Sequence, residues 1–366
     1  MHQFKFVSVL LMAMILAGCG GGGSDVPAKP RFAAQVSFGD SLSDVGSYNV
    51  GLVNAIGGGQ FTINAASSVK ATTPTNWTEY TSLSLGLDMP CAAETGLDNG
   101  SGAAPGTPAG TVIPVTDYPL CNGYAQGGSR VTAQPGIGNK LLGGGGFALT
   151  VPVVTQIQHF LTAHSGSFNG DEIVTVMAGA NDVLFQAASI GGGLPAASGV
   201  AAVQTAASEL ANDVKTQIIA KGAKYVVVAN IPDIAGTPYV TSIADPTVRA
   251  QTAGLMDTLV TAFNAQLKAD LPDSANVLNV DAYSASKDEV ANPAKYNLTD
   301  VTHTACDLAS PYNPLASSLG CNANSLSGTL AAVDHYLFAD TVHPTPYGHL
   351  LFATYVLQSM TNKGWY

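Results

Sequence analysis

Short segments that are apolar at nearly every position constrain the fold of this chain more than any other feature of the sequence. They lie at residues 35–38, 172–177, 225–229 and 277–280. A strand that is apolar on both faces has to be covered on both faces, which is typical of the parallel sheets of α/β proteins. The pattern therefore predicts a mainly parallel sheet at the centre of the molecule.

Segments with helical periodicity separate and follow these strands. We predict helices at residues 151–164, 198–220, 246–271 and about 346–360. Right-handed crossover connections between parallel strands place such helices on both faces of the sheet. We therefore expect one α/β domain over residues 35–366, folded as a three-layer α/β/α sandwich of the flavodoxin-like kind.

The composition excludes several classes of protein. Hydrophobic residues make up 46% of the 366 positions, which is enough for a large core and excludes an intrinsically disordered chain. The formal net charge is −11 and no two basic residues are adjacent, so nucleic acid is not expected as a partner. Glycine and small polar residues concentrate at 50–75 and 86–150, where we expect irregular loops.

The N-terminus has the features of an export signal. Residues 1–18 combine one basic residue with an apolar run that is too short to stay in a bilayer as a spanning helix. The sequence Leu-Ala-Gly-Cys at 16–19 resembles a lipobox, in which Cys19 would carry lipid; an ordinary signal peptide with an incidental cysteine is the alternative. Residues 19–34 would then be a flexible tether. We expect an exported protein, either an outer-membrane lipoprotein or periplasmic, of a Gram-negative bacterium.

Four cysteines remain when Cys19 is set aside. An even number in an oxidising compartment suggests two disulfides, which four cysteines can form in three ways. The pairing of nearest neighbours, Cys91–Cys121 with Cys306–Cys321, would close two loops rich in Gly, Pro, Asn and Ser. A zinc site is disfavoured, because the sequence contains no C-x-x-C pair.

Four polar segments are expected near the carboxyl ends of the strands. They are residues 38–44, 122–130, 177–182 and 339–345. Taken singly, each has an ordinary explanation: a helix N-cap, a glycine turn, an Asn-Asp turn and a surface histidine near an aspartate. In an open parallel sheet, however, ligand sites lie beyond the carboxyl ends of the strands. We therefore expect the four segments to meet at one edge of the sheet.

Together the four segments supply every group that acyl transfer requires. Ser41 is the candidate nucleophile, His343 the base and Asp340 the carboxylate that orients the base. The candidate oxyanion donors are the Ser41 N–H, the Gly128 N–H and the Asn181 side chain. The order along the chain is serine, aspartate, histidine.

The same segments resemble the conserved blocks of the GDSL, or SGNH, hydrolase family. The nucleophile block corresponds to residues 39–42, the glycine block to 124–128, the asparagine block to 179–182 and the D-x-x-H block to 340–343. The longer form at 38–46 is similar to the branch of bacterial lecithinase-, haemolysin- and acyltransferase-like esterases. The resemblance extends from residue 36 to about 350, which is nearly the whole chain after the signal.

The resemblance implies a serine hydrolase, an esterase or lipase, that cleaves carboxylic esters through an acyl-enzyme without a metal or organic cofactor. It leaves open which paired glycine donates to the oxyanion; the spacing from Asn122 favours Gly128 over Gly127. A monomer acting on a small-molecule or lipid ester, and held at the membrane through a lipid on Cys19, is expected. The alternatives are a phospholipase or acyltransferase, a carbohydrate O-acetyl esterase, and a binding lipoprotein without turnover.

Residues near these segments are expected to have other roles. Structural roles are predicted for four titratable residues: Asp44, Asp182, His335 and His349. Asp182 is expected to brace the loop behind Asn181. The apolar residues 183–185 and Val342 either form an acyl pocket or belong to the first turn of a core helix.

Overall fold

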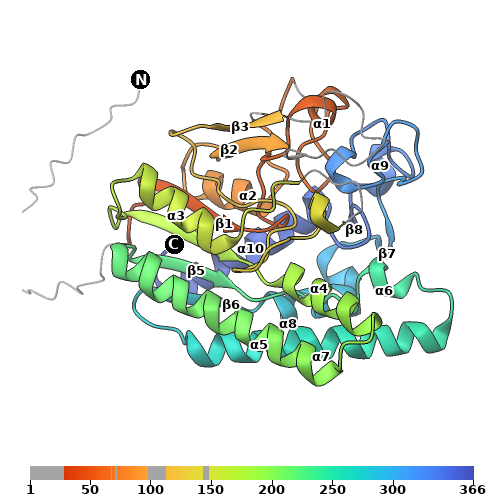
Figure 1. The fold of residues 1–366 in the computed structure, drawn as a ribbon. Helices are drawn as coiled ribbons and strands as arrows, with labels where there is room; N and C mark the ends of the chain where they lie inside the picture. The colour runs from red at the N-terminus through yellow and green to blue at the C-terminus, as the bar shows by residue number, and fades with distance from the viewer. Residues whose placement is uncertain (1–28, 67, 71, 98–112, 143–147) are drawn as a thin grey trace, which may run out of the picture.

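A computed structural model describes residues 29–66, 68–70, 72–97, 113–142 and 148–366. The predicted signal peptide, Cys19 and most of the tether lie outside the described residues. The four predicted strands form one parallel sheet in the order β1-β4-β5-β6 (Figure 1). Their bounds are β1 Ala34–Gly39, β4 Glu172–Met177, β5 Tyr225–Ala229 and β6 Val277–Val280.

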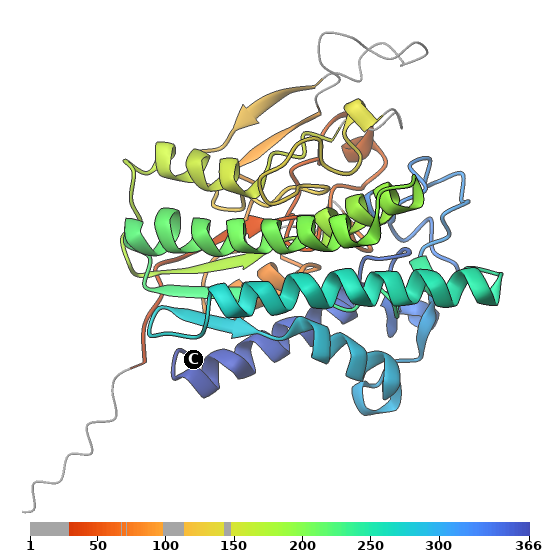
Figure 2. The same cartoon turned by 60° about the horizontal axis from the view of Figure 1, so that its bottom comes forward.

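Alternate residues of the strands face two separate hydrophobic cores. Val174 and Val176 of β4 point into one core, whereas Ile173 and Met177 of the same strand point into the other. The first core is covered by α3 (Val153–Ala163), α4 (Ala180–Gly191), α5 (Ala196–Asp213) and α7 (Pro246–Asp270). The second is covered by α2 (Trp77–Ser84) and α10 (Pro346–Lys363), together with the start of α8 (Ala282–Ala291). The predicted three-layer α/β/α sandwich is confirmed, and Figure 2 shows α5 and α7 running side by side along it.

An irregular segment extends the sheet beyond β1. The Ser37 N–H donates to the Asn122 carbonyl at 3.0 Å, and the Tyr124 N–H donates back to the Ser37 carbonyl at 2.8 Å. On its other side Gly123 exchanges backbone hydrogen bonds with Cys91 and Ala93, and the Cys91–Cys121 disulfide joins the two segments. This pairing carries the glycines that follow to the carboxyl end of β1.

A small lobe next to the sheet carries the second disulfide. Cys306 and Cys321 form this bond, and both half-cystines are fully buried in a cluster of apolar side chains. The lobe contains the parallel pair β7 (Asp300–Thr304) and β8 (Tyr336–Phe338), the 3₁₀ turn η5 (Ser318–Gly320) and the short helix α9 (Leu330–Val333). The structure thus contains both disulfides of the nearest-neighbour pairing.

Removing the lobe disulfide is expected to destabilise the protein measurably. The bond closes a loop of 15 residues, for which loop-entropy arguments give about 3 kcal/mol. The double variant Cys306→Ser/Cys321→Ser should therefore lose about 3 kcal/mol of unfolding free energy in a denaturant titration. Wild-type protein titrated with and without a reductant provides the control. A loss below about 1 kcal/mol would show that packing alone holds the lobe.

The loops predicted as irregular contain short elements. Region 86–150 includes the antiparallel pair β2 (Glu94–Leu97) and β3 (Ile113–Asp117) and the turn η1 (Lys140–Leu142), and region 50–75 includes α1 (Gly51–Ala55). Strand β3 is mostly exposed, so it lacks the apolar run that marks the central strands. The helix predicted at 198–220 changes at Val214 to a wider turn, η2 (Val214–Ile218), and then to the 3₁₀ turn η3 (Ile219–Lys221).

Several short elements were not predicted at all, because they are too short to show a period. They are α6 (Pro238–Thr241), η4 (Pro293–Tyr296), α8, α9, β7, β8 and α2. Among the described residues, no helix combines the length and the apolar character that crossing a bilayer requires.

Candidate active site

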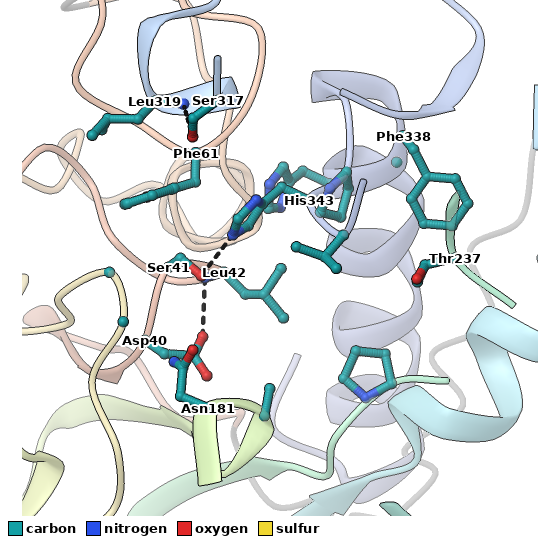
Figure 3. A pocket seen from close by; sticks show the side chains of 18 of the residues that line it. Asp40, Ser41, Leu42, Phe61, Asn181, Thr237, Ser317, Leu319, Phe338 and His343 are labelled. Carbon is teal, nitrogen blue, oxygen red and sulfur yellow. Dashed lines mark hydrogen bonds between the residues drawn. The ribbon is translucent and has the colours of Figure 1, made fainter. Parts of the chain in front are cut away.

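Three side chains predicted as a triad meet at the carboxyl end of β1, and Figure 3 shows two of them, Ser41 and His343, joined by a hydrogen bond. Ser41 lies in the turn that follows this strand, and its Oγ atom is 2.8 Å from His343 Nε2. The other ring nitrogen of His343, Nδ1, lies 2.8 Å from each carboxylate oxygen of Asp340. Residues 302 positions apart in the sequence thus form one continuous chain of hydrogen bonds.

The Asp340 carboxylate is held by backbone donors as well as by the imidazole. Its Oδ1 accepts from the N–H groups of Val342 and His343, and its Oδ2 accepts from the Ser318 N–H at 2.9 Å. Burial raises the pKa of Asp340, but the charge of His343 and these hydrogen bonds outweigh burial and bring the pKa below its usual range. The group therefore stays ionised and can stabilise an imidazolium.

The paired glycines differ in what their N–H groups do. The Gly127 N–H donates to Asp44 Oδ2 at 2.9 Å and is therefore occupied. Neither the Gly128 N–H nor the Ser41 N–H has an acceptor in the part of the chain that the structure describes. Both residues line the cavity next to the serine hydroxyl, together with Asn181. This arrangement favours Gly128 as the oxyanion donor, in agreement with the spacing argument.

No side chain fits at Gly128. Its φ is +80°, in the left-handed region, and an added Cβ would lie 1.9 Å from the Ile137 carbonyl oxygen. The Ile137 N–H in turn donates to the Gly128 carbonyl at 2.9 Å. The close approach of these two backbones fixes the orientation of the Gly128 peptide, which is why glycine is required here.

Asn181 is presented by the first turn of α4. One N–H of its side-chain amide donates to the Ser129 carbonyl at 2.9 Å, which leaves the second N–H for a ligand. The neighbouring Asp182 accepts from Arg130 Nε at 3.1 Å and from the Val131 N–H at 3.0 Å. Asp182 therefore braces the loop behind Asn181, the role the sequence suggested.

Residues 183–185 belong to helix α4, so the helical interpretation of this run is right. Their side chains lie in two different environments, the hydrophobic core and the cavity beside Ser41. Val183 is fully buried in the core, whereas Leu184 lines the cavity beside Ser41, as does Val342. The pocket interpretation is thus right for part of the run.

A glutamine that the sequence analysis missed holds the end of β1. The Gly39 N–H donates to Gln156 Oε1 at 2.9 Å, and Gln156 Nε2 donates back to the Gly39 carbonyl at the same distance. Gln156 also donates to Ser129 Oγ at 3.2 Å, so it ties the serine turn to the glycine loop. A signal was present in the sequence: Gln156 is a polar residue on the otherwise apolar buried face of α3.

Asp40, next to the nucleophile, is fully enclosed. Burial raises its pKa to about 7, although the Leu42 N–H donates to its Oδ1 at 3.0 Å. Its other oxygen, Oδ2, has no hydrogen-bond partner among the residues that the structure describes. Behind His343, the ring of Phe61 lies 5.0 Å from the imidazole and limits its movement.

Of the other residues expected to be structural, His335 and His349 make no hydrogen bond to the triad side chains in the described part of the chain. His335 stacks on Tyr347, and its Nδ1 lies 2.7 Å from the Asn297 carbonyl. His349 is buried, which lowers its pKa to about 3. Among the described residues, no group of three or more His, Cys, Asp or Glu side chains is arranged to hold a metal ion.

A second D-x-x-H sequence shows how little the motif means by itself. Asp300 accepts from the N–H groups of Thr302 and His303, and its Oδ2 lies 2.8 Å from His303 Nδ1, as in the Asp340 turn. The His303 side chain, however, is 78% exposed and has no serine partner in the described part of the chain. Only the tertiary contact with Ser41 distinguishes the two turns.

Ser41 opens into a cavity of about 810 Å³ whose walls are mostly apolar. Figure 3 shows Phe61 and Leu319 on one side of the serine and Phe338 and Thr237 on the other. Such a cavity can receive the two halves of an ester on either side of the nucleophile.

The comparisons with known proteins agree with the motifs. Residues 36–356 match the family described as GDSL-like Lipase/Acylhydrolase. The chain belongs to this family. Family membership makes it a carboxylic ester hydrolase. A search of curated protein sequences gave no match.

Solved structures similar to this GDSL-like hydrolase include an acetylxylan esterase, an alpha/beta hydrolase and a lipase. Axe2, an acetylxylan esterase from Geobacillus stearothermophilus, has 15% identity and a TM-score of 0.35 over 91% of this chain and 96% of its own. LAE5, an alpha/beta hydrolase from the metagenome of Lake Arreo, Spain, has 15% identity and a TM-score of 0.39 over 90% and 97%. The lipase Lip_vut3 from goat rumen metagenome has 16% identity and a TM-score of 0.30 over 64% and 76%.

Removing the Asn181 amide from this hydrolase is expected to slow turnover with little effect on stability. Loss of one oxyanion donor typically costs about a hundredfold to a thousandfold in kcat. We expect Asn181→Ala to show this loss with p-nitrophenyl esters, with a change in KM that is small by comparison. Asn169→Ala, at a turn far from Ser41, is the control. An unchanged kcat in a variant with normal melting would exclude Asn181 from the oxyanion hole.

Proposed function

We propose that Ser41 attacks the ester carbonyl while His343 Nε2 takes the proton of the serine hydroxyl. The observation that carries this proposal is the 2.8 Å contact between Ser41 Oγ and His343 Nε2. Asp340 orients the ring through Nδ1 and stabilises the imidazolium that forms. The negative charge on the carbonyl oxygen is received by the Ser41 N–H, the Gly128 N–H and the Asn181 amide.

Collapse of the tetrahedral intermediate breaks the ester C–O bond. His343 gives its proton to the departing alcohol, and the acyl group remains bound to Ser41 Oγ. A water molecule then transfers a proton to His343 and attacks the acyl carbon, and a second collapse releases the carboxylic acid. Ser41 recovers its proton from His343, so the enzyme ends the cycle unchanged.

The size and lining of the cavity support esters with a substantial apolar group. A volume of about 810 Å³ far exceeds what an acetyl group fills, and most of the lining side chains are apolar. A small-molecule or lipid ester with a medium or long chain therefore fits better than a carbohydrate acetate. The same cavity would suit a phospholipase, and it would suit an acyltransferase, which the experiment below identifies.

A panel of p-nitrophenyl esters from acetate to palmitate tests this function. We expect kcat/KM to rise from acetate toward longer chains, because each buried methylene adds apolar contact in the cavity. Ser41→Ala provides the background rate. A maximum at acetate would contradict the lipid-ester proposal, and no hydrolysis of any ester would contradict the catalytic one. Added glycerol or methanol that diverts the acyl group to a new ester would identify an acyltransferase.

The position of the enzyme in the cell is a further part of the proposal. The lipobox-like sequence at 16–19 supports export, with a lipid on Cys19 as a membrane anchor. We expect the full-length protein in the membrane fraction of a Gram-negative host and a Cys19→Ala variant in the periplasmic fraction. Recovery of both proteins in the same soluble fraction, with an unmodified Cys19 in the mass spectrum, would contradict the anchor.

A further inference from the structure

One face of helix α8 forms a wall of the cavity that contains Ser41. The residues of this wall recur at the spacing of one helix face: Ala282, Ala285, Ser286, Glu289 and Val290. We call them the α8 wall. The cavity lining also includes the apolar side chains of Leu337 and Phe338, whose hydrophobic cluster packs against Val290. Glu289 is the one ionisable residue of the α8 wall.

Glu289 is buried without a partner. Its residue is only 8% exposed, and its carboxyl group makes no hydrogen bond within the part of the chain that the structure describes. Burying a carboxyl group without a hydrogen-bond partner lowers the stability of the folded protein, so Glu289 is unfavourable in the substrate-free state. The residue nevertheless lines the cavity, where a substrate can reach it.

The other polar groups near Glu289 already have partners. Ser286 Oγ accepts from the Asp233 N–H at 2.9 Å and donates to the Tyr283 carbonyl at 3.1 Å. Thr237 Oγ1 donates to the Ile234 carbonyl at 2.8 Å. The hydroxyl groups of Ser286 and Thr237 thus already make hydrogen bonds within the protein. The carboxyl group of Glu289 remains available to a ligand.

Two further cavity residues also have an unpartnered atom, but those atoms are closed off. Asp40 Oδ2 and His349 Nε2 have almost no accessible surface. Asp233, the other carboxylate along this side of the cavity, receives the Ala235 N–H on its Oδ1 at 3.0 Å. Glu289 is therefore the carboxyl group best placed to recognise a substrate.

The surroundings of Glu289 favour its neutral form. Burial raises its pKa to about 7, and the negative charge of Asp288 acts in the same direction. The adjacent cation, Lys287, is directed elsewhere, because its Nζ donates to the Tyr283 hydroxyl at 3.0 Å. A neutral carboxyl group can both donate and accept a hydrogen bond, so it matches a hydroxyl or a carbonyl and not an ion.

We propose that Glu289 determines specificity by hydrogen-bonding a hydroxyl or carbonyl oxygen on the chain of the ester substrate. The inference rests on the proposed ester hydrolysis at Ser41 and makes it more specific. The preferred substrates are oxygenated esters, such as hydroxyacyl esters, in which the polar group reaches the α8 wall. A plain alkyl chain leaves Glu289 unpaired, whereas an oxygenated chain completes its hydrogen bonding.

Matched pairs of esters test the proposal. One series places a terminal hydroxyl or a terminal methyl on the acyl chain of p-nitrophenyl esters from butanoyl to dodecanoyl. A second series places the hydroxyl or the methyl on the alcohol chain, and titration of the released acid measures hydrolysis. In at least one series, we expect wild type to prefer the hydroxylated member by about tenfold to a hundredfold in kcat/KM at the chain length that reaches Glu289.

Three variants assign that preference to the carboxyl group. Glu289→Leu should abolish it by favouring the plain chain, and Glu289→Gln should retain it, because the amide also donates and accepts. Asp233→Asn, which alters the carboxylate already paired with Ala235, should leave the ratio of the two esters as in wild type.

The outcomes separate this inference from the proposed function. Hydrolysis by Glu289→Leu with the same ester preference as wild type would overturn the role of Glu289 and leave the Ser41 mechanism intact. A wild-type preference for a terminal ammonium over a hydroxyl would also overturn it, because that result requires an ionised carboxylate. Absence of hydrolysis in wild type would count against Ser41 itself.

Discussion

Replacing Ser41 with alanine is expected to lower kcat by about a millionfold, which leaves only the residual rate that the oxyanion donors and substrate binding supply. Alanine removes the oxygen that lies 2.8 Å from His343 Nε2, so no acyl-enzyme can form. Ser41 is 9% exposed, and within the described residues its hydroxyl has no hydrogen-bond partner besides the imidazole, so the variant should melt close to wild type. The measurement is steady-state hydrolysis of a p-nitrophenyl ester alongside thermal unfolding.

Ser43→Ala is the matched control for this variant. Ser43 lies in the same turn, is fully buried, and its Oγ accepts from Trp77 Nε1 at 3.2 Å. Its loss should reduce stability by about 1 kcal/mol and kcat by less than tenfold. Retention of more than one hundredth of the wild-type kcat by Ser41→Ala would show that another nucleophile is at work.

Replacing Asp340 with asparagine is expected to lower kcat by about ten thousandfold. The carboxylate accepts from His343 Nδ1 and thereby presents Nε2 to Ser41 as a proton acceptor. An amide at this position can turn its N–H₂ group toward the ring and favour the wrong tautomer. It also has one acceptor oxygen where the carboxylate has two, so the Ser318 N–H or the turn N–H groups lose their partner.

The turn at Asp300 offers a control with nearly the same local structure. Asp300→Asn changes an aspartate that also pairs with a histidine three residues later, but this histidine contacts no serine. We expect Asp300→Asn to keep kcat within about twofold of wild type, since surface substitutions rarely affect distant chemistry. If both variants lost activity to the same degree, the effect of Asp340→Asn would be structural and not catalytic.

The fold could be predicted largely because its central strands are apolar on both faces. The strands predicted at 172–177, 225–229 and 277–280 agree with β4, β5 and β6 residue for residue. Each of them lies between two helical layers, so nothing in their sequence needs to face water. The polar segments that follow the strands were expected at one edge of the sheet, and the triad lies there.

What the sequence could not reveal depends on contacts between distant segments. Gln156 and Ser318 support the site through hydrogen bonds to Gly39 and Asp340, and neither stands in a motif. Glu289 carried no signal in the sequence, because α8 was not predicted and only the cavity shows which face of this helix is enclosed. The D-x-x-H block was assigned to 340–343 by its resemblance to the family, but the contact of His343 with Ser41 is seen only in the fold.

The most direct measurement of the central claim is covalent trapping with a fluorophosphonate probe, followed by intact-mass analysis and peptide mapping. The account predicts one adduct per chain, located on Ser41, with none on Ser41→Ala and slow labelling of Asp340→Asn. An adduct mapped to a different residue, or an unlabelled wild type that still hydrolyses esters, would contradict the assignment of Ser41 as the nucleophile.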